Sequence, residues 1–465
     1  MAAVRGFSVS APIEALGDAA GCEVKSESVA SPSRSLIKRM LLSASATVML
    51  QGVSMAVGFV TTILLARGLG GIGYGRYIFS LTWSSLLVIP AILGLDRFLV
   101  RGIAKYEVEQ QWRLMRGLLR RTNQLVLLAS TAMAGIGAVV AILWLSRSLR
   151  WPFCVAMLLV PLTTLTLVRQ GAMQAIDRVV SGQLPEYLIR PVLTLAGIGA
   201  LEFIGHGVLT STTALGANVV GVAVAFTVGA AVLRRALPPA LRSVRPDYAT
   251  REWMRAALPM MLISGVWMAN NYVTTLLVGT LDGPRAVGVY SVVQKGAELI
   301  VVVLVAANMP LAPVIARAHA RADREGLQHA AERVAQATLL VSLPAAAAFT
   351  IFPGVYLNIF GSSFHTGATA LVILALAQLV NAAAGPAGNV LIMTGHERVA
   401  VRGIGAGLIA NLVLGIALIP PLGVTGGAIA SASSLVLWNV VLLVLARRRV
   451  GVNVTAVRSL RMARS

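Results

Sequence analysis

Long runs of apolar residues, separated by short polar segments, follow one another along almost the whole chain. A hydrocarbon layer about 30 Å thick needs roughly 20 apolar helical residues to cross it, and about twelve runs approach or exceed that length. They cover residues 41–66, 77–100, 123–146, 152–168, 187–205, 208–233, 256–280, 287–314, 334–359, 367–394, 400–422 and 424–446. The pattern predicts an all-α integral membrane protein with about twelve transmembrane helices.

The first and seventh runs share a sequence pattern. Residues 60–65, Val-Thr-Thr-Ile-Leu-Leu, lead to Gly70, Gly75 and Tyr77, and without any gap residues 273–278, Val-Thr-Thr-Leu-Leu-Val, lead to Gly283, Gly288 and Tyr290. The offset between the two copies is 213 residues, from 60 to 273. The chain is therefore built from two related halves, and duplicated helix bundles are a common architecture of secondary transporters.

The largest polar interruption inside the chain, at about 234–255, separates six runs from six. We expect two pseudosymmetric six-helix bundles, at residues 38–240 and 241–450. Residues 1–37 lack the continuous apolar core of a cleavable signal peptide, so they are interpreted as a disordered cytoplasmic tail, and 451–465 as a basic cytoplasmic tail.

The composition is typical of an integral membrane protein, since 57% of residues are hydrophobic, 12% are charged and the mean hydropathy is +0.80. The net charge of +21 raises the question of nucleic acid binding. However, most of the Lys and Arg residues fall on alternate loops, and Arg169, Arg178 and Arg190 are assigned to that same side. The opposite loops hold only Arg67, Arg76, Arg147, Arg150 and Arg285. This asymmetry predicts both termini in the cytoplasm and no nucleic acid partner.

Polar residues form a stripe on one face of the first span, and a matching stripe on the seventh. The first comprises Thr47, Gln51, Ser54, Gly58 and Thr61, and the second Ser264, Trp267, Asn271 and Thr274. Each stripe taken alone is explained by hydrogen bonds between packed helices. Their occurrence in both halves favours a central cavity lined by Gln51, Ser54, Trp267 and Asn271, with Asn270 beside them.

Four ionisable residues lie well inside predicted spans: Asp96, Arg97, Lys295 and Glu298. A charge at mid-bilayer costs about 2.5–3.5 kcal/mol on insertion scales, so such residues pair, face water or act on a substrate. Lys295 and Glu298 share a face and can pair, whereas the neighbours Asp96 and Arg97 are expected to point in different directions. The alternatives are a structural ion pair for Lys295 with Glu298 and snorkelling of Arg97 to the interface.

The other polar residues at membrane depth are Gln294, Asn308, Asn381 and Asn411, and we expect them to hold helices together. No nucleotide-binding loop, nucleophile motif or metal-ligand spacing is found, so we expect no enzyme activity, no metal site and no cofactor.

Several motifs resemble the Wzx-type flippases of polysaccharide biosynthesis, in the superfamily that includes the multidrug and toxin extruders and the lipid II flippase. The resemblance covers residues 38–446. In the first half it rests on Ala66-Arg67-Gly68-Leu69-Gly70, Gly73-Tyr74-Gly75-Arg76-Tyr77, Gly94-Leu95 and Arg101. In the second half it rests on Leu258-Pro259, Gly288-Val289-Tyr290-Ser291, Gly395-His396-Glu397-Arg398, Asn411-Leu412, Leu418-Ile419-Pro420 and the stretch from Gly423 to Ala430.

The resemblance implies a V-shaped pair of bundles, opening alternately to the two sides of the cell inner (cytoplasmic) membrane. It implies translocation of a polyprenyl-diphosphate-linked oligosaccharide to the outer leaflet, for exopolysaccharide, capsule or O-antigen export. Membrane lipids, a polysaccharide polymerase and a chain-length regulator are the implied partners. Arg97 and Lys295 are then candidates for the diphosphate, and Asp96 and Glu298 for proton or cation coupling.

Two rival functions stay open. One is a cation-coupled multidrug or metabolite extruder of the same fold, and the other is a scaffold for a glycan assembly complex that transports nothing. A positively charged cavity suits a diphosphate and a negatively charged one suits cationic drugs, but the four charges in the spans cancel. The lipid II branch typically has fourteen spans, so a count of about twelve favours the oligosaccharide branch.

The topology is testable. A reporter fused after Arg285 is expected to lie outside the cytoplasm, because that loop belongs to the side poor in Lys and Arg. Alkaline phosphatase and green fluorescent protein fusions at this position measure it. Phosphatase activity agrees with the prediction, whereas fluorescence without phosphatase activity overturns it.

Overall fold

The computed structural model describes residues 34–204, 208–321, 323–452 and 454–456. Side chains are described from Ser45 onward, except within those gaps and at 242, 263, 302–310, 312–313, 316 and 319–320. The chain divides into compact units at 1–42 and 43–465, and everything below concerns the second unit. Most of the predicted tail 1–37 lies outside the described residues.

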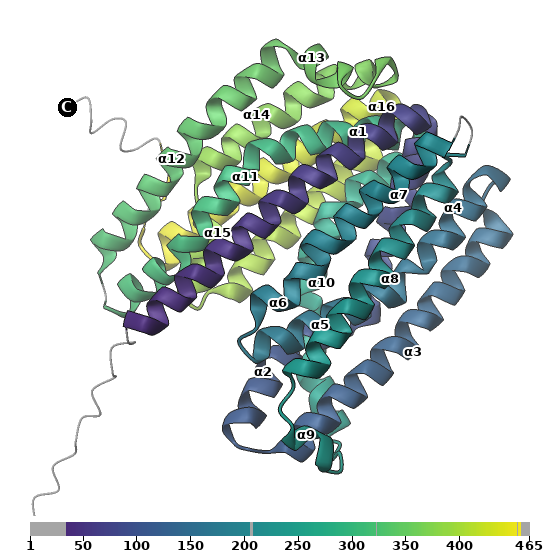
Figure 1. The fold of residues 1–465 in the computed structure, drawn as a ribbon. Coiled ribbons are helices and arrows are strands. Elements are labelled where there is room, and N and C mark those ends of the chain that lie inside the picture. Colours follow the sequence, from purple (N-terminus) through teal and green to yellow (C-terminus); the bar gives the residue numbers. More distant parts are fainter. Residues whose placement is uncertain (1–33, 205–207, 322, 453, 457–465) are drawn as a thin grey trace, which may run out of the picture. The chain divides into compact units, whose positions relative to one another are not determined.

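All regular structure in the described residues is helical (Figure 1). The first half contains α1 (Arg34–Ile92), α2 (Leu95–Val108), α3 (Trp112–Trp144), α4 (Arg147–Met157), α5 (Leu159–Ala175), α6 (Val179–Leu184), the π-helix η1 (Pro185–Ile189), α7 (Arg190–Ile204), α8 (Ser211–Ala236) and α9 (Ala240–Ser243). The second half contains α10 (Thr250–Leu281), α11 (Pro284–Ala320), α12 (Arg324–Ile351), α13 (Pro353–Asn358), the 3-10 helix η2 (Ser362–Gly367), α14 (Ala368–Ala384), α15 (Ala387–Met393) and α16 (Glu397–Arg449).

Nine helical stretches in the described residues are long and apolar enough to cross a membrane. Two of them, Ser45–Ile92 and Glu397–Arg449, each contain two helices joined at a glycine outside the helical region. These glycines are Gly70 (φ 65°) and Gly423 (φ 55°), where the left-handed backbone suits a residue without Cβ. Helix α11, with 37 residues, is about 55 Å long and adds a further spanning length. The arrangement agrees with twelve spans.

The two halves that the sequence repeat predicts also share an equivalent side-chain hydrogen bond. The Asn218 amide donates to the Tyr77 hydroxyl over 3.1 Å, and 213 positions later the Ser431 and Tyr290 hydroxyls are hydrogen-bonded over 2.8 Å. Both pairs are 141 residues apart in the chain. The repeat therefore extends from the first helix of each half to its last.

Equivalent glycines of the two halves meet where α1 crosses α11. A Cβ added to Gly75 would lie 1.6 Å from the Pro284 carbonyl oxygen, and one added to Gly288 would lie 2.3 Å from the Gly71 carbonyl oxygen. Because Gly75 and Gly288 are 213 residues apart, this contact joins corresponding points of the two repeats. We name it the glycine crossing, and it is a backbone-to-backbone contact that no side chain fits.

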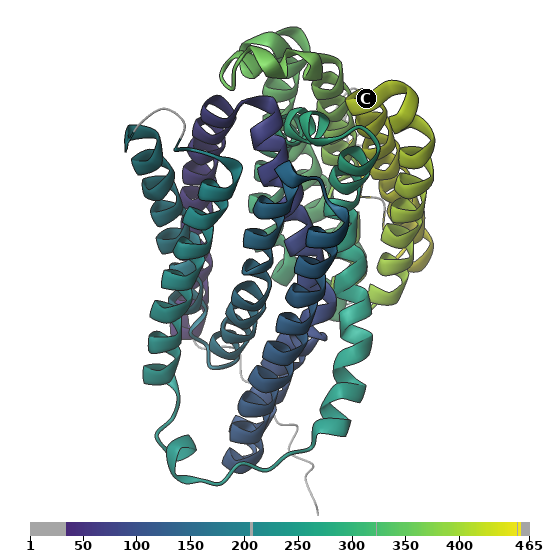
Figure 2. The same cartoon turned by 90° about the vertical axis from the view of Figure 1, so that its right-hand side faces the viewer.

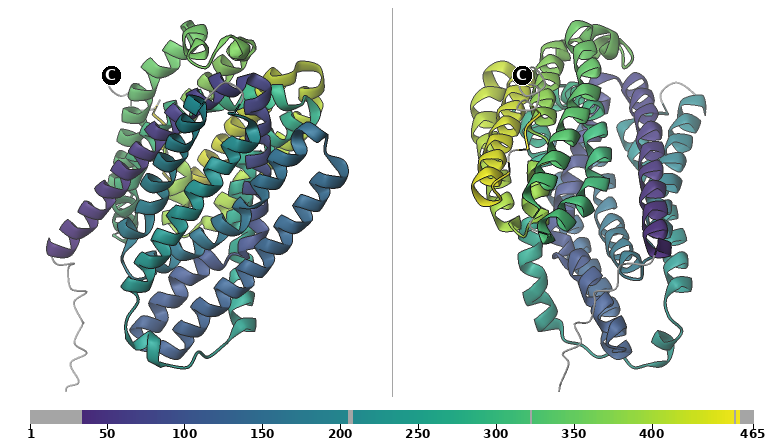
Figure 3. Two further views of the ribbon diagram at one scale, coloured as in Figure 1. Left: turned by 45° about the vertical axis from the view of Figure 1, so that its right-hand side comes forward. Right: turned by 90° about the vertical axis from the view of Figure 1, so that its left-hand side faces the viewer.

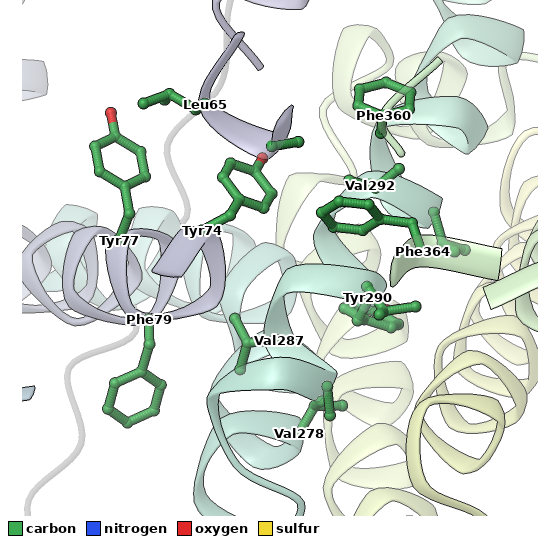
Figure 4. Close-up of a cluster of buried hydrophobic side chains, with 14 of the residues drawn as sticks. Leu65, Tyr74, Tyr77, Phe79, Val278, Val287, Tyr290, Val292, Phe360 and Phe364 are labelled. Carbon is green, nitrogen blue, oxygen red and sulfur yellow. The ribbon is translucent and has the colours of Figure 1, made fainter. Parts of the chain in front are cut away.

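An aromatic cluster packs around the crossing, and it comprises Tyr74, Tyr77, Phe79, Tyr290, Tyr356, Phe360 and Phe364. Figure 4 shows Tyr74 of α1 beside Phe364 of η2, and their ring centroids are 6.2 Å apart. Arg67 adds a hydrogen bond from its Nε to the Ile359 carbonyl oxygen over 2.7 Å. The two halves are thus closed against each other at this end, which the predicted topology places outside the cytoplasm.

At the opposite end there are two distinct cores. One combines α2, α3 and α5 of the first half with the start of α10 of the second half, so α10 packs against the first half here. The other combines α11, α12, α15 and α16, and Figure 2 shows the helices that carry both cores. In the second half α12 and α16 both pack against α14, and the right-hand view of Figure 3 shows this group in green and yellow. The first residues of the predicted basic tail belong to the second half, since Val452, Val454 and Ala456 are buried.

The glycine crossing can be tested by adding a side chain. Gly75→Val is expected to favour the state in which this end is open, because overpacking costs about 1–3 kcal/mol, a roughly tenfold shift in population. Labelling of Cys at position 291, which is buried beside the crossing, by a membrane-impermeant thiol reagent measures the opening. Gly199→Val is the control, since nothing lies within 4 Å of a Cβ there. Equal labelling of both variants would show that the crossing does not hold this end closed.

Candidate functional site

Lys295 and Glu298 form an ion pair inside α11, with 2.6 Å between the Lys295 Nζ and Glu298 Oε2 atoms. The sequence prediction that they can pair is confirmed. Lys295 lies eleven residues beyond Pro284 at the start of α11, which is about 16 Å along the helix axis and close to half the thickness of a hydrocarbon layer. Both side chains are 40–45% exposed, so the pair is accessible rather than buried in the bundle.

The pair lies beneath the aromatic cluster. Glu298 interacts electrostatically with Tyr74 of the first half and with Tyr290 and Tyr356 of the second. The Ser291 and Thr62 side chains, which come from the two different halves, lie beside the Tyr74 hydroxyl. A molecule that reached Lys295 in this state would therefore meet the closed end of the protein just beyond it.

Asp96 and Arg97 lie where α1 gives way to α2. The break is at Leu93 (φ 55°) and Gly94 (φ 70°), and Asp96 occupies the first turn of α2, where the helix dipole favours a negative charge. The expectation that the two side chains point in different directions is wrong: the Arg97 Nε atom approaches Asp96 Oδ2 to 3.8 Å. Both residues lie inside α2, where neighbouring side chains leave the helix about 100° apart, but the Arg97 side chain is long enough to bend back toward the Asp96 carboxylate. Arg97 remains 70% exposed.

The predicted cavity residues of the stripes differ in exposure. Gln51 and Ser54 are half-buried on α1, while Trp267 on α10 is 57% exposed. The Asn271 amide donates to the Trp267 carbonyl oxygen over 3.2 Å, and the buried Asn270 Oδ1 atom has no hydrogen-bond partner. Their place on a common cavity stays a prediction. Within the described residues, no ion pair joins Asp96 or Arg97 to Lys295 or Glu298.

Other polar residues hold helices together. The Thr274 hydroxyl donates to the Asn411 side chain over 3.0 Å and is bonded to Ser431 over 2.8 Å, so this end of the second stripe packs against α16. The Thr275 hydroxyl donates to Gln294 over 3.3 Å, and Asn439 donates to Asn381 over 3.0 Å. The prediction for Gln294, Asn381 and Asn411 is confirmed, whereas the Asn308 side chain lies outside the described residues.

One charged group does not lie where the sequence pattern predicted it. Arg169, expected in a loop, is inside α5 and only 3% exposed. Near it, Glu186 of η1 forms an ion pair with Arg190 of α7, and Arg190 Nη2 donates to Asn218 over 3.5 Å. The available signals were the position of Arg169 one residue beyond a predicted span and the four-residue spacing of Glu186 and Arg190.

Metal ligands are not gathered anywhere in the part of the chain that the structure describes: no three His, Cys, Asp or Glu side chains are placed to hold an ion. The candidate site therefore has three parts. The Lys295–Glu298 ion pair is partly exposed at membrane depth, the Asp96–Arg97 pair lies just after a helix break, and the glycine crossing closes the end of the protein next to Lys295.

Solved structures with a similar fold include multidrug transporters and a lipid II flippase. One described as the inward-facing conformation of a multidrug resistance MATE family transporter of the MOP superfamily has a TM-score of 0.71 at 14% identity, over 85% of this chain and 94% of that chain. The lipid II flippase MurJ, inward closed, has a TM-score of 0.68 at 12% identity, over 88% and 87%. An outward-facing MATE family transporter has a TM-score of 0.58 at 15% identity, over 88% and 95%.

Family models agree with the fold. The MatE model matches residues 259–417, while no curated protein sequence matches the chain. The model described as polysaccharide biosynthesis protein matches residues 41–319, more than half of the chain. The chain therefore belongs to the polysaccharide biosynthesis protein family.

Proposed function

We propose that the protein translocates a polyprenyl-diphosphate-linked oligosaccharide from the cytoplasmic to the outer leaflet of the inner membrane, with both termini in the cytoplasm. The accessible cation at membrane depth, Lys295, carries the proposal. A diphosphate and several sugars would lose their hydrogen bonds to water in hydrocarbon, so the headgroup needs polar partners within the protein while its lipid tail stays in the bilayer.

Lys295 is suited to such a headgroup because its present partner can be replaced. Its ammonium group bonds the carboxylate of Glu298, and both remain 40–45% exposed. A diphosphate carries more negative charge than a carboxylate and offers more acceptor oxygens, so it competes for the ammonium group. Glu298 is then left to bind a proton or a cation, which is the coupling role that we assign to it together with Asp96.

Arg97 offers a second cation at a different depth. Along the helix axes it lies about 30 Å from Gly75, whereas Lys295 lies about 10 Å from Gly288, the partner of Gly75 in the crossing. Its guanidinium is 70% exposed near the end that the predicted topology places in the cytoplasm. We infer that the diphosphate meets Arg97 first and Lys295 afterwards, as it moves toward the closed end.

The closed crossing fits a state that loads from the cytoplasm. The higher TM-score against the inward-facing transporter, 0.71, than against the outward-facing one, 0.58, supports this assignment. Translocation then requires the glycine crossing to open and the opposite end to close. A polymerase and a chain-length regulator would receive the product, and they stay predicted partners.

A cation-coupled multidrug or metabolite extruder is the second candidate function. The MatE match over residues 259–417 favours it. The Lys295–Glu298 pair does not decide between the two functions, since the carboxylate offsets the ammonium charge.

Substitution of the two cations tests the proposal. Lys295→Ala and Arg97→Ala are each expected to reduce translocation of a fluorescent polyprenyl-diphosphate oligosaccharide in proteoliposomes by about tenfold or more, the effect of losing a hydrogen bond to a charged group. Lys295→Arg is expected to retain activity. Lys105→Ala is the matched control, because Lys105 is a similarly exposed cation on α2 that pairs with Glu109 at the far end of the helix. Full activity of both alanine variants would refute the diphosphate assignment.

A further inference from the structure

Arg169 is a buried cation without a hydrogen bond. It is 3% exposed, and its Nε, Nη1 and Nη2 atoms are all inaccessible to solvent with no hydrogen-bond partner. The guanidinium lies against α8 at Gly229, where a Cβ would be 1.7 Å from Nη1, so only a glycine leaves space for it. Removing a charge from water without a partner is strongly unfavourable. A partner in another state of the protein would explain why the cation is there.

Glu186 is placed to be that partner. One of its carboxylate oxygens, Oε1, bonds Arg190, while the other, Oε2, is buried and has no hydrogen bond. Arg169 experiences the negative charge of Glu186. One carboxylate therefore lies near two arginines but bonds only one of them.

The segment that carries Glu186 can change its geometry. Residues Pro185–Ile189 form a π-helix between α6 and α7, and Pro185 has no N–H to donate to the helix. A π-turn is wider than an α-turn, and conversion between the two rotates the side chains that it carries. Such a rotation offers Glu186 a path from Arg190 on one side to Arg169 on the other.

Arg190 connects this cluster to the glycine crossing. Its Nη2 atom donates to the Asn218 side-chain oxygen over 3.5 Å, and the Asn218 amide donates to the Tyr77 hydroxyl over 3.1 Å. Tyr77 is two residues beyond Gly75. In the second half the corresponding Tyr290 is bonded to Ser431, whose hydroxyl is bonded to Thr274, so this hydrogen-bond chain is made of neutral groups. The corresponding chain in the first half ends on the charged Arg190.

We propose that Glu186 exchanges its partner, from Arg190 when the glycine crossing is closed to Arg169 when it opens, and that Arg169 is thereby a positioning residue for the transport cycle. Loss of the carboxylate from Arg190 frees that guanidinium and weakens its hold on Asn218 and Tyr77. The proposal requires that the crossing opens during the cycle, but it does not depend on which molecule is transported.

Disulfide formation across the closed end provides the measurement. A Cβ at Gly71 of α1 lies 3.6 Å from the Ser363 Cβ of η2, a separation typical of a disulfide. In the Gly71→Cys, Ser363→Cys protein, the initial rate of disulfide formation under limiting oxidant follows the fraction of molecules with this end closed. No substrate is present, so the result is independent of the substrate assignment.

Two arginine substitutions are expected to act in opposite directions. Arg169→Met removes the partner of the open state, so the closed fraction and the disulfide rate rise. Arg190→Met removes the partner of the closed state, so the rate falls, on the order of tenfold for a lost hydrogen bond to a charged group. Lys105→Met is the control and leaves the rate unchanged. A purely structural role would move both arginine variants in the same direction, and that result, or no change in either, overturns the proposal.

If Arg190→Met does not fold, a second comparison still tests the proposal. Glu186→Gln removes the charge that both arginines compete for, so Arg169→Met is expected to change the disulfide rate in the parent protein but not in the Glu186→Gln background. An equal effect of Arg169→Met in both backgrounds shows that Arg169 does not act through Glu186 and rejects the exchange.

Discussion

The contact between Gly75 and Gly288 is the constraint on which the rest of the structure depends. Two backbones approach so closely that neither position has room for a Cβ, and the residues that meet are equivalent in the two repeats. Hydrophobic burial by the surrounding aromatic cluster then stabilises the closed end, where Tyr74 and Phe364 pack across the two halves. Such a contact forms completely or not at all, because a close-packed crossing has no partly open version with comparable packing.

Around this near-symmetric crossing the charges are distributed asymmetrically. The second half carries the partly exposed Lys295 and Glu298, and the first half carries Glu186 and Arg190 together with the buried Arg169. Charges at membrane depth are unfavourable unless they pair or face water, so each cluster has a physical cost that packing alone does not explain. We propose a division of roles. Lys295 and Glu298 act on the diphosphate, whereas Glu186 changes its arginine partner when the glycine crossing opens or closes.

Helical periodicity predicted much of this fold from the sequence, because the apolar spans and the pairing of Lys295 with Glu298 are properties of single helices or of the repeat. It was wrong about Asp96 and Arg97, since helical spacing fixes where a side chain starts but not how a long arginine side chain bends toward a neighbouring carboxylate. It missed the environment of Arg169, which depends on α8 supplying a glycine at position 229. Contacts between distant helices leave no local pattern, and the shared cavity of Gln51, Ser54 and Trp267 stays a prediction for the same reason.

The central claim is that the crossing must open for a molecule to pass. Translocation of the lipid-linked oligosaccharide by the Gly71→Cys, Ser363→Cys protein in proteoliposomes, before oxidation, after oxidation and after reduction, tests it most directly. We expect activity before oxidation, loss of activity when the disulfide holds the two halves together at this end, and recovery when it is reduced. Undiminished translocation by fully cross-linked protein would contradict the claim.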